Sequence, residues 1–227
     1  MNQNHKDRIS IQVGLNGYSF RLDNGGQKHS SGWLSADRVF STPEFQRRYD
    51  QVEISLFTPK TTLVPEQFYS QEDSRMVLAG VAPLDGADVV SHVAVPEFGA
   101  VLVYSNSMGE SLTKVISDTV LLTDGSNAAV LPEHYFMLRH LSCMTEYNKI
   151  VASYMDGRLY LVIAQGNSLM LCNSYEAQDF TTAEYFIFLA MKKLQLNPEV
   201  SVISFRTPLE PEQEMSLYHY FKTVEHI

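Results

Sequence analysis

The polar side chains of this chain do not form a complete catalytic motif. The sequence contains no Gly-x-x-x-x-Gly-Lys-Ser/Thr loop for phosphate and no Gly-x-Ser-x-Gly elbow for a nucleophile. His134 and His140 lie six residues apart, a spacing that does not put two metal ligands on one helix face. Asp118, Asp124 and Asp156 could meet in the folded chain, but carboxylates beside strands more often belong to solvated turns. These residues alone therefore do not predict an enzyme.

Two turn dipeptides, Asn16-Gly17 and Asp156-Gly157, each lie between two runs of strand-forming residues. The flanking runs are residues 9–15 and 18–22 for the first, and 150–155 and 159–164 for the second. Asn-Gly and Asp-Gly favour type I′ hairpin turns, in which both turn residues have positive φ. The sequence therefore predicts two β-hairpins, each opening a three-stranded antiparallel unit that is followed by a helix and another strand.

Composition and charge limit the classes of partner. The 227 residues are 44% hydrophobic and 19% charged, which suits one large globular domain or two closely packed lobes. The net charge is −9 and no basic run is longer than a pair, so we expect no direct nucleic acid binding and no anionic membrane surface as partner. The longest apolar run, residues 185–191, is far shorter than the roughly 20 residues that span a bilayer. No membrane insertion is expected.

The two cysteines, Cys143 and Cys172, have apolar or small neighbours and no second Cys or His at metal-ligand spacing. We expect buried, reduced thiols, which fit a reducing cytoplasm. Residues 1–8 contain no apolar stretch before a small-residue cleavage site, so export by a signal peptide is not predicted. The sequence therefore predicts a soluble, cytoplasmic protein without a metal site.

The N-terminal part reads as strands with one short helix. Residues 24–26, Asn-Gly-Gly, predict a second turn that leads to a weaker strand near residues 33–34. Thr42 followed by Pro and Glu is typical of a helix start, so we expect a short helix over 43–49. Alternating apolar residues over 52–56 predict the next strand.

The middle of the chain is less regular. Residues 89–95 and 100–104 predict a hairpin, and Pro96 between them places it at a sheet edge. A helix over 108–117, a strand at 120–123 and a helix after Pro132 are expected next.

No Gly, Ser or Pro linker divides the chain, so we expect lobes that share a core. The N-terminal lobe is predicted to comprise residues 1–125, with an irregular insertion at about 60–110, and the C-terminal lobe residues 126–227.

The C-terminal part is the most regular. It predicts three strands ending near residue 175, a helix, a strand over 200–205 and a last helix over about 211–221 that finishes the chain. Thr181 and Glu184 can form a capping box at the start of the first of these helices. Residues 185–191 are apolar all round, which predicts a helix wedged between layers.

The doubled order of strand, strand, strand, helix and strand resembles the actin-like ATPase fold, the superfamily of sugar kinases, heat-shock-70 chaperones, actin and pilus-assembly ATPases. The chain is also similar to one poorly characterised bacterial family of that superfamily, a domain of unknown function. That likeness is carried by Ile11-Gln12-Val13-Gly14-Leu15-Asn16-Gly17-Tyr18-Ser19-Phe20, Thr62-Leu63-Val64-Pro65-Glu66 and Leu171-Cys172-Asn173-Ser174-Tyr175. It covers nearly the whole chain and implies an α/β fold with mixed sheets, a duplicated ribonuclease H-like arrangement whose two lobes are each of β-β-β-α-β type.

The resemblance implies three nucleotide-binding elements, and the sequence departs from all of them. In the superfamily each hairpin tip carries Asp-x-Gly and then Thr or Ser, so that turn N–H groups hold phosphate and the carboxylate holds hydrated Mg²⁺. Here the first tip has Asn16 instead of an acid and a bulky Tyr18 where phosphate would approach. The second tip keeps Asp156 but lacks the second Gly and the hydroxyl residue. In place of the third element, a Gly-Gly against adenine, the chain has Phe205 and Arg206.

We therefore expect an actin-like protein that is not an enzyme and that binds a protein partner or itself, at the interlobe cleft or a sheet edge. No catalytic residue, metal or cofactor is predicted. The alternative is a divergent nucleotide-binding protein or ATPase, in which ATP and Mg²⁺ at the interlobe cleft would contact Asn16, Gly17, Asp156 and Gly157. In that alternative Asp156 is the main metal ligand and Asn16 a hydrogen bonder. A third alternative is an accessory of a nucleic-acid enzyme that acts through a protein partner. The aromatic cluster at residues 218–221 would suit an interface.

Overall fold

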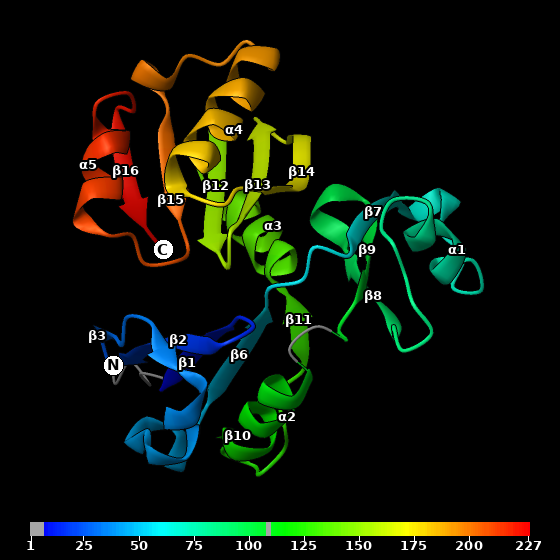
Figure 1. The fold of residues 1–227 in the computed structure, drawn as a ribbon, viewed down its shortest axis with the longest axis vertical. Coiled ribbons are helices and arrows are strands. Elements are labelled where there is room, and N and C mark those ends of the chain that lie inside the picture. Colours follow the sequence, from blue (N-terminus) through cyan, green and yellow to red (C-terminus); the bar gives the residue numbers. More distant parts are fainter. Residues whose placement is uncertain (1–6, 108–109) are drawn as a thin grey trace, which may run out of the picture. The chain divides into compact units, whose positions relative to one another are not determined.

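The computed structural model describes residues 7–107 and 110–227. Contacts along the chain divide it into two compact units. The first comprises Met1–Thr58, Gly86–Val89 and Ser105–Glu133, and the second comprises Pro59–Asp85, Val90–Tyr104 and His134–Ile227. Each unit contains a sheet of at least five strands together with helices, so the predicted α/β class with mixed sheets is confirmed (Figure 1).

The first unit is built on a mixed sheet in the order β11-β6-β1-β2-β3, with β4 also paired to β2. Its strands are β1 (Arg8–Val13), β2 (Gly17–Asn24), β3 (Gln27–Ser30), β4 (Leu34–Ser35), β6 (Gln51–Leu56) and β11 (Val130–Pro132). The strands β1, β2 and β3 are antiparallel, whereas β6 runs parallel to β1 and β11 parallel to β6. The third strand of this sheet is therefore β3, and the weaker strand predicted near residues 33–34 corresponds to the short β4.

The second unit contains a sheet in the order β14-β13-β12-β15-β16. Its strands are β12 (Asn148–Met155), β13 (Arg158–Gln165), β14 (Ser168–Glu176), β15 (Val202–Phe205) and β16 (Thr223–His226). Here too the first three strands are antiparallel, while β15 is parallel to β12 and β16 to β15. The two sheets thus have the same strand order and the same strand directions.

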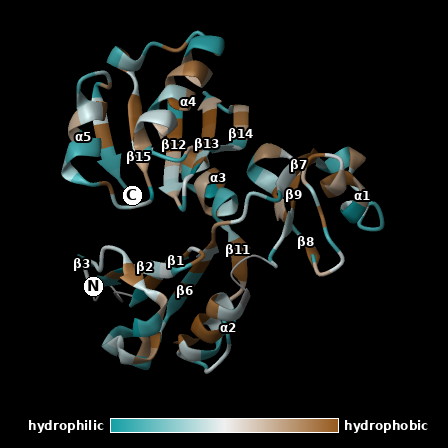
Figure 2. Ribbon diagram, viewed as in Figure 1, coloured by the Kyte–Doolittle hydropathy of each residue, from teal (hydrophilic) through white to brown (hydrophobic). Residues whose placement is uncertain are grey.

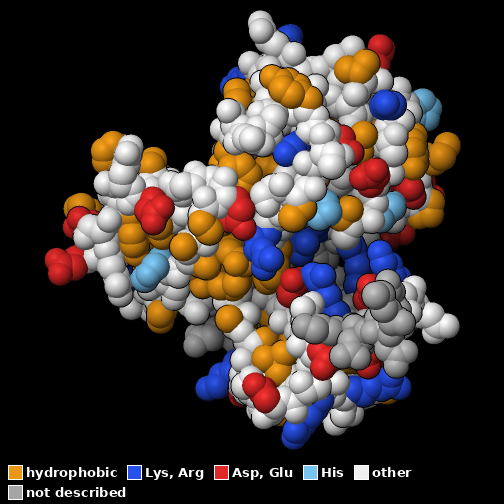
Figure 3. Space-filling view, turned by 180° about the vertical axis from the view of Figure 1, so that it is seen from behind, with side chains coloured by type: hydrophobic (Ala, Val, Ile, Leu, Met, Phe, Trp, Pro, Cys, Tyr) orange, Lys and Arg blue, Asp and Glu red, His pale blue; other side chains and the backbone are white. Residues whose placement is uncertain are grey.

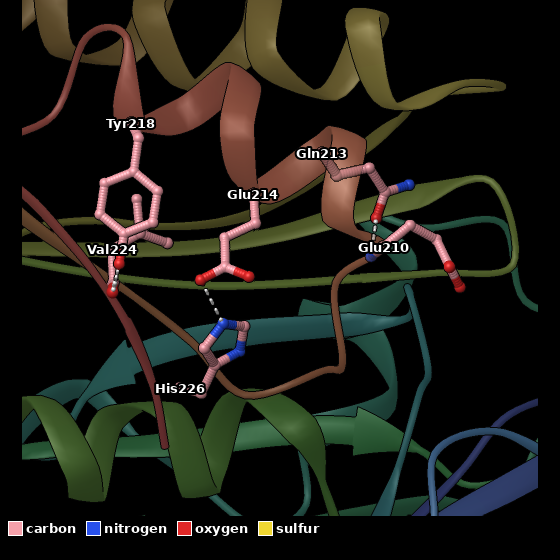
Figure 4. A network of polar contacts seen from close by, with 6 residues as sticks. All are labelled: Glu210, Gln213, Glu214, Tyr218, Val224 and His226. Carbon is pink, nitrogen blue, oxygen red and sulfur yellow. Dashed lines mark hydrogen bonds and ion pairs between the residues drawn. The ribbon is translucent and has the colours of Figure 1, made fainter.

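The strand β16 was not predicted, because the last helix was expected to finish the chain. That helix, α5 (Pro211–Tyr218), ends earlier, and β16 is a short strand whose residues show no extended apolar alternation. Figure 4 shows how α5 holds β16: the Tyr218 hydroxyl donates to the Val224 carbonyl at 3.1 Å, and His226 Nε2 lies 3.2 Å from Glu214 Oε1. These contacts fix the fifth strand against the helix.

The helix expected over 43–49 is shorter than predicted and of another type: a 3₁₀ helix, Pro43–Gln46, begins at the expected residue but ends before β5 (Arg48–Tyr49), which pairs with β10 (Leu121–Leu122). A second 3₁₀ helix, Ala36–Ser41, precedes it. The Thr42 side chain caps no helix. It bonds instead to the Arg38 carbonyl at 2.9 Å and to the Tyr18 hydroxyl at 2.6 Å. A hydroxyl engaged in the core cannot satisfy the first N–H groups of a helix.

The long helix α4 (Phe180–Lys193) lies along the second sheet (Figure 1). Its N-cap is Asp179, whose carboxylate accepts from the Thr182 N–H at 2.7 Å, so the predicted capping box of Thr181 and Glu184 is wrong. The helix is also not wedged between layers: one stripe, including Ile187, is buried, but Tyr185 is 60% exposed. The helix begins two residues earlier than the box requires, and it covers a single sheet face in its own unit.

A small three-stranded sheet completes the second unit. Its order is β7-β9-β8, with β7 (Thr61–Pro65), β8 (Val90–Val95) and β9 (Ala100–Ser105), and it packs with α1 (Ser74–Ala79). The predicted hairpin of residues 89–104 is confirmed, and Pro96 follows the edge strand β8. Figure 3 shows hydrophobic side chains on the surface of this part, where the exposed ones include Phe68 and Met76.

Two further helices, α2 (Glu110–Thr119) and α3 (Glu133–Cys143), confirm the helices expected near 108–117 and after Pro132. Residues 108–109 at the predicted start lie outside the described residues. Each large sheet has its own apolar cluster, and hydrophobic residues follow the strands β12 to β15 in Figure 2. None of the helices within the described ranges is long and apolar enough to cross a membrane.

Candidate functional site

The first hairpin tip does not contain the predicted type I′ turn. Val13 pairs with Tyr18, so four residues, 14–17, form the loop, and neither Asn16 nor Gly17 has a positive φ. Gly17 pairs instead with Ser35 of β4. A Cβ atom on Gly17 would clash with the Leu34 carbonyl oxygen and lie 2.9 Å from Trp33 Nε1. Glycine is therefore required here by the close approach of β4, and not by the turn.

The side chains beside this tip are also used within the unit. The Asn16 side chain is exposed, and the Asn16 carbonyl accepts from the Ala36 N–H at 3.1 Å. The Tyr18 ring is fully buried against Phe45, with 5.0 Å between the ring centroids, and its burial raises the pKa of Tyr18. The expectation that Tyr18 lies where phosphate would approach is therefore wrong, because its ring points into the core.

The second tip is the predicted type I′ turn. Met155 pairs with Arg158, and the two residues between them, Asp156 and Gly157, have φ of 51° and 68°. The Asp156 side chain is exposed. The Gly157 carbonyl accepts from the Ala177 N–H at 2.8 Å. This hydrogen bond ties the tip to the chain just after β14. A metal or phosphate at Asp156 stays a prediction.

The segment after β15 packs into the second unit. Phe205 is fully buried, and its ring centroid lies 6.2 Å from that of Phe180. The Thr207 hydroxyl accepts from the Tyr154 N–H at 3.0 Å. The Arg206 guanidinium lies 5.5 Å from the centre of the Phe136 ring, a distance at which a cation–π attraction operates. Phe205 therefore belongs to the core and is not an exposed wall of a ligand site.

Sequence reasoning missed a buried polar network in the first unit. Gln12 Nε2 donates to Glu133 Oε1 at 3.0 Å, the Ser55 hydroxyl donates to Glu133 Oε2, and the Ser19 hydroxyl donates to Gln12 Oε1 at 3.3 Å. All four side chains are at most 5% exposed. The signal in the sequence was that Gln12 and Ser55 are polar residues between apolar neighbours, and the register that places them opposite each other on parallel strands appears only in the structure. The network fixes Glu133, at the N-terminus of α3, where a negative charge is favoured by the helix dipole.

The histidine and cysteine predictions have mixed outcomes. His134 is a core histidine: it is fully buried, and its ring lies edge-on to Tyr160. Both cysteines are free, but Cys143 is exposed, so the expectation of two buried thiols is wrong for this residue, which lies near the end of α3. Cys172 is half-buried, and burial raises its pKa to about 12. Over the described ranges no cluster of three or more His, Cys, Asp or Glu could hold a metal ion.

The aromatic cluster at residues 218–221 is divided between surface and core. Tyr218 and Tyr220 are 47% and 52% exposed, whereas Phe221 is buried. The Tyr220 ring packs on Phe188 at 4.8 Å between centroids. An interface role for this cluster stays a prediction.

The second unit contains a groove of about 600 Å³, which we call the β14 groove. It is lined by residues 59–63, 81–83 and 169–174, together with Arg158 and Glu176. The buried His134 contacts two of the segments that line the groove: its Nδ1 lies 3.1 Å from Thr61 Oγ1, and its Nε2 lies 3.2 Å from the Asn173 carbonyl oxygen. Because a carbonyl only accepts, Nε2 carries the proton and Nδ1 accepts from Thr61 in the neutral ring.

Comparisons with known proteins agree with this fold. A model of the family described as "Protein of unknown function (DUF3822)" matches residues 1–224. A Bacteroides thetaiotaomicron protein with an actin-like ATPase fold and unknown function is similar over 99% of this chain and 92% of its own, with a TM-score of 0.66 and 14% identity. The PilM–PilN type IV pilus biogenesis complex is similar over 97% and 88%, with a TM-score of 0.50 and 11% identity. Among proteins of curated function no match is found. These likenesses establish an actin-like fold, as the sequence resemblance implied.

Proposed function

This chain belongs to the DUF3822 family of proteins of unknown function, and we propose that it is an assembly module that binds a protein partner and does not hydrolyse nucleotides. In this proposal the actin-like fold serves as a scaffold.

The observation that carries the proposal is the internal use of the three segments that nucleotide chemistry would need. Gly17 lies against β4, the Gly157 carbonyl bonds to Ala177, and the segment after β15 contributes Phe205 to the core. A phosphate site needs turn N–H groups that face a ligand, and an adenine site needs bare backbone. Segments fixed by their own neighbours are poorly suited to either role.

The comparison with a pilus biogenesis complex supports the same proposal, because there a similar fold is found in a protein assembly. The chain's net charge of −9 also favours a protein over a nucleic acid as partner.

A thermal-shift experiment on the full chain tests the proposal. We expect no change in melting temperature with ATP, ADP or GTP in the presence of Mg²⁺. A nucleotide present at 100 times its Kd would add about 2.7 kcal/mol of stability, which is easily detected. A saturable, Mg²⁺-dependent shift accompanied by ATP hydrolysis would overturn the proposal, provided that Asp156→Ala abolishes both and the control Glu72→Ala, at another exposed acid, does not.

The second candidate function is Mg²⁺-nucleotide binding, and one observation favours it. Asp156 presents an exposed carboxylate at the tip of a tight turn, where Mg²⁺ could be held through water. The same two variants decide between the candidates, because only this alternative requires Asp156.

A further inference from the structure

An exposed aromatic surface lies on the second unit where α4 and the end of α5 meet. Both helices pack on the core of the second sheet, α4 through Ile187 and α5 through Leu217. Tyr185 and Tyr220 are 60% and 52% exposed. The half-buried Phe188 ring lies edge-on to Tyr220, with 4.8 Å between the ring centroids. Because Tyr185 and Phe188 are three residues apart on one helix, their side chains are neighbours. The three rings therefore form one surface.

Neighbouring rings hold these side chains in place. Phe188 stacks on the buried Phe221, with 5.8 Å between the centroids. Tyr185 lies edge-on to Phe186 at 5.4 Å, and Phe186 stacks on Tyr175 of β14 at 4.8 Å. A side chain that is already fixed loses little conformational entropy on binding, and tyrosine is among the residues that dominate binding energy at interfaces. The surface is therefore suited to a partner.

Beside these rings lies a carboxylate with an unsatisfied oxygen. Glu184 Oε1 is buried and has no hydrogen-bond partner among the residues that the structure describes. Asn24 Oδ1 shares this condition, but it belongs to a neutral amide. A buried charged oxygen without a donor costs free energy, and such groups are rare in natural proteins. The Glu184 side chain is only half-buried, so a cation from solvent can reach the carboxylate, whose charge is shared by both oxygens. Glu184 is one turn before Phe188, on the same side of α4.

The charges around Glu184 are of one sign. Residues 179–191 and 208–218 contain five acids and no Lys, Arg or His, and two lysines follow only in the last turn of α4. The five acids are Asp179, Glu184, Glu210, Glu212 and Glu214. Glu214 points to β16, where it pairs with His226, whereas Glu184 takes part in no such ion pair within the described ranges (Figure 4). This part of the surface therefore favours a cationic partner group.

We propose that Glu184, Tyr185, Phe188 and Tyr220, which we call the α4–α5 face, bind an apolar segment of a partner protein that carries an arginine. The guanidinium pairs with the Glu184 carboxylate and stacks on the Phe188 and Tyr220 rings, and apolar side chains beside the arginine pack on Tyr185. Arginine suits the face better than lysine, because its planar group pairs with a carboxylate and also stacks on aromatic rings. The proposal rests on the proposed assembly function and supplies the chemistry of its partner.

The probe is a library of random ten-residue peptides displayed on phage and selected on the full chain. We expect the enriched peptides to carry an arginine next to apolar residues. A synthetic copy of the best peptide should bind Glu184→Gln at least about tenfold more weakly, because the ion pair is lost. Glu212→Gln, which removes an exposed acid of α5, is the matched control and should change binding less than about twofold. Enriched peptides without arginine, no enriched peptide, or equal effects of the two variants would overturn the proposal.

A double-mutant cycle assigns the contact. The arginine of the peptide is replaced by citrulline, which has the same shape and no charge. If the guanidinium pairs with Glu184, citrulline weakens binding to the natural chain about tenfold but changes binding to Glu184→Gln little. Independent, additive losses would show that the arginine binds elsewhere and would contradict the proposal.

The stability of the free chain separates a binding role from a structural one. Glu184→Gln should raise the melting temperature of the free chain by roughly 2 °C, because it removes a buried charge that lacks a partner. A lower melting temperature would mean that Glu184 supports the fold, and self-association of the free chain that Tyr185→Ser abolishes would mean that a second copy covers the face. Either result contradicts the proposal. Both leave the thermal-shift result with nucleotides intact, so the two proposals fail separately.

Discussion

Each of the two large sheets contains a serine that donates to a glutamate, but the surroundings of the two pairs differ. Ser55 on β6 and Ser204 on β15 each precede the last residue of their strand. Ser55 donates to Glu133, directly after the neighbouring strand β11, and Ser204 donates to Glu225 on the neighbouring strand β16. Glu133, the partner of Ser55, is fully buried, whereas Glu225, the partner of Ser204, is exposed. Two sheets of one strand order can therefore place equivalent polar groups in the core or in water.

The hairpin tips differ in a related way. Asp156-Gly157 forms the two-residue turn that its sequence predicts, and the bond from the Ala177 N–H to the Gly157 carbonyl leaves that turn intact. At Asn16-Gly17 the strand β4 pairs with Gly17 and the loop widens to four residues. A local signal of equal strength thus gave two geometries, because only at the first tip does another strand pair with the turn glycine.

The largest expected effect tests the comparison of the buried and the exposed serine–glutamate pair. Glu133→Ala leaves Gln12 and Ser55 without their acceptor in a dry core and creates a cavity, so it should destabilise the fold by about 3 kcal/mol. Glu225→Ala, at the exposed carboxylate, should change the free energy of unfolding by less than about 0.5 kcal/mol. Urea denaturation of both variants measures the difference. Similar values for the two would mean that burial of the pair has no energetic consequence.

The next effect concerns the close approach at the first tip. Gly17→Ala forces a Cβ into the Leu34 carbonyl and the Trp33 ring, which should cost about 2 kcal/mol of stability. Gly86→Ala is the matched control, because no atom lies within 4 Å of the added Cβ and φ there is not positive. Equal unfolding midpoints of the two variants in the same denaturant would rule out the close-approach explanation.

The turn conformations give a smaller effect. Gly157→Ala must hold alanine at a φ of 68°, which should destabilise the protein by roughly 1 kcal/mol. Asn16→Ala should be neutral within about 0.5 kcal/mol, since Asn16 is exposed and has no positive φ. Thermal unfolding distinguishes them, and a reversed order would contradict the assignment of turn types.

The smallest effect is a pH dependence at the start of α4. The N–H of Thr182, by its hydrogen bond, lowers the pKa of Asp179 in the folded chain. The stabilisation by this cap is thus fully present above the ordinary Asp value of about 3.9 and is lost as the pH falls through the lower folded pKa. In Asp179→Asn the amide caps at every pH. The stability difference between the two proteins should therefore titrate only below about pH 4, and an NMR titration of the Thr182 amide locates the midpoint. A difference that stays constant down to the acid limit would show that the cap is not a carboxylate.

The strand pattern predicted most of the second sheet, because residues 150–175 contain runs of strand-forming residues and the turns between them are local. It failed where tertiary contacts decide: Thr42 bonds within the core and caps no helix, and the strand β16 depends on α5 for its position. The network of Glu133 could not be predicted, since it requires the register of strands far apart in the sequence. The β14 groove was foreseen only as a general possibility of a sheet edge.

Hydrogen exchange of the backbone amides tests the central claim most directly, because it reads both hairpin tips in one experiment. The full chain is measured alone and with saturating MgATP. The account predicts that MgATP leaves exchange at residues 14–17 and 156–158 unchanged. Slower exchange at both tips with MgATP would contradict it.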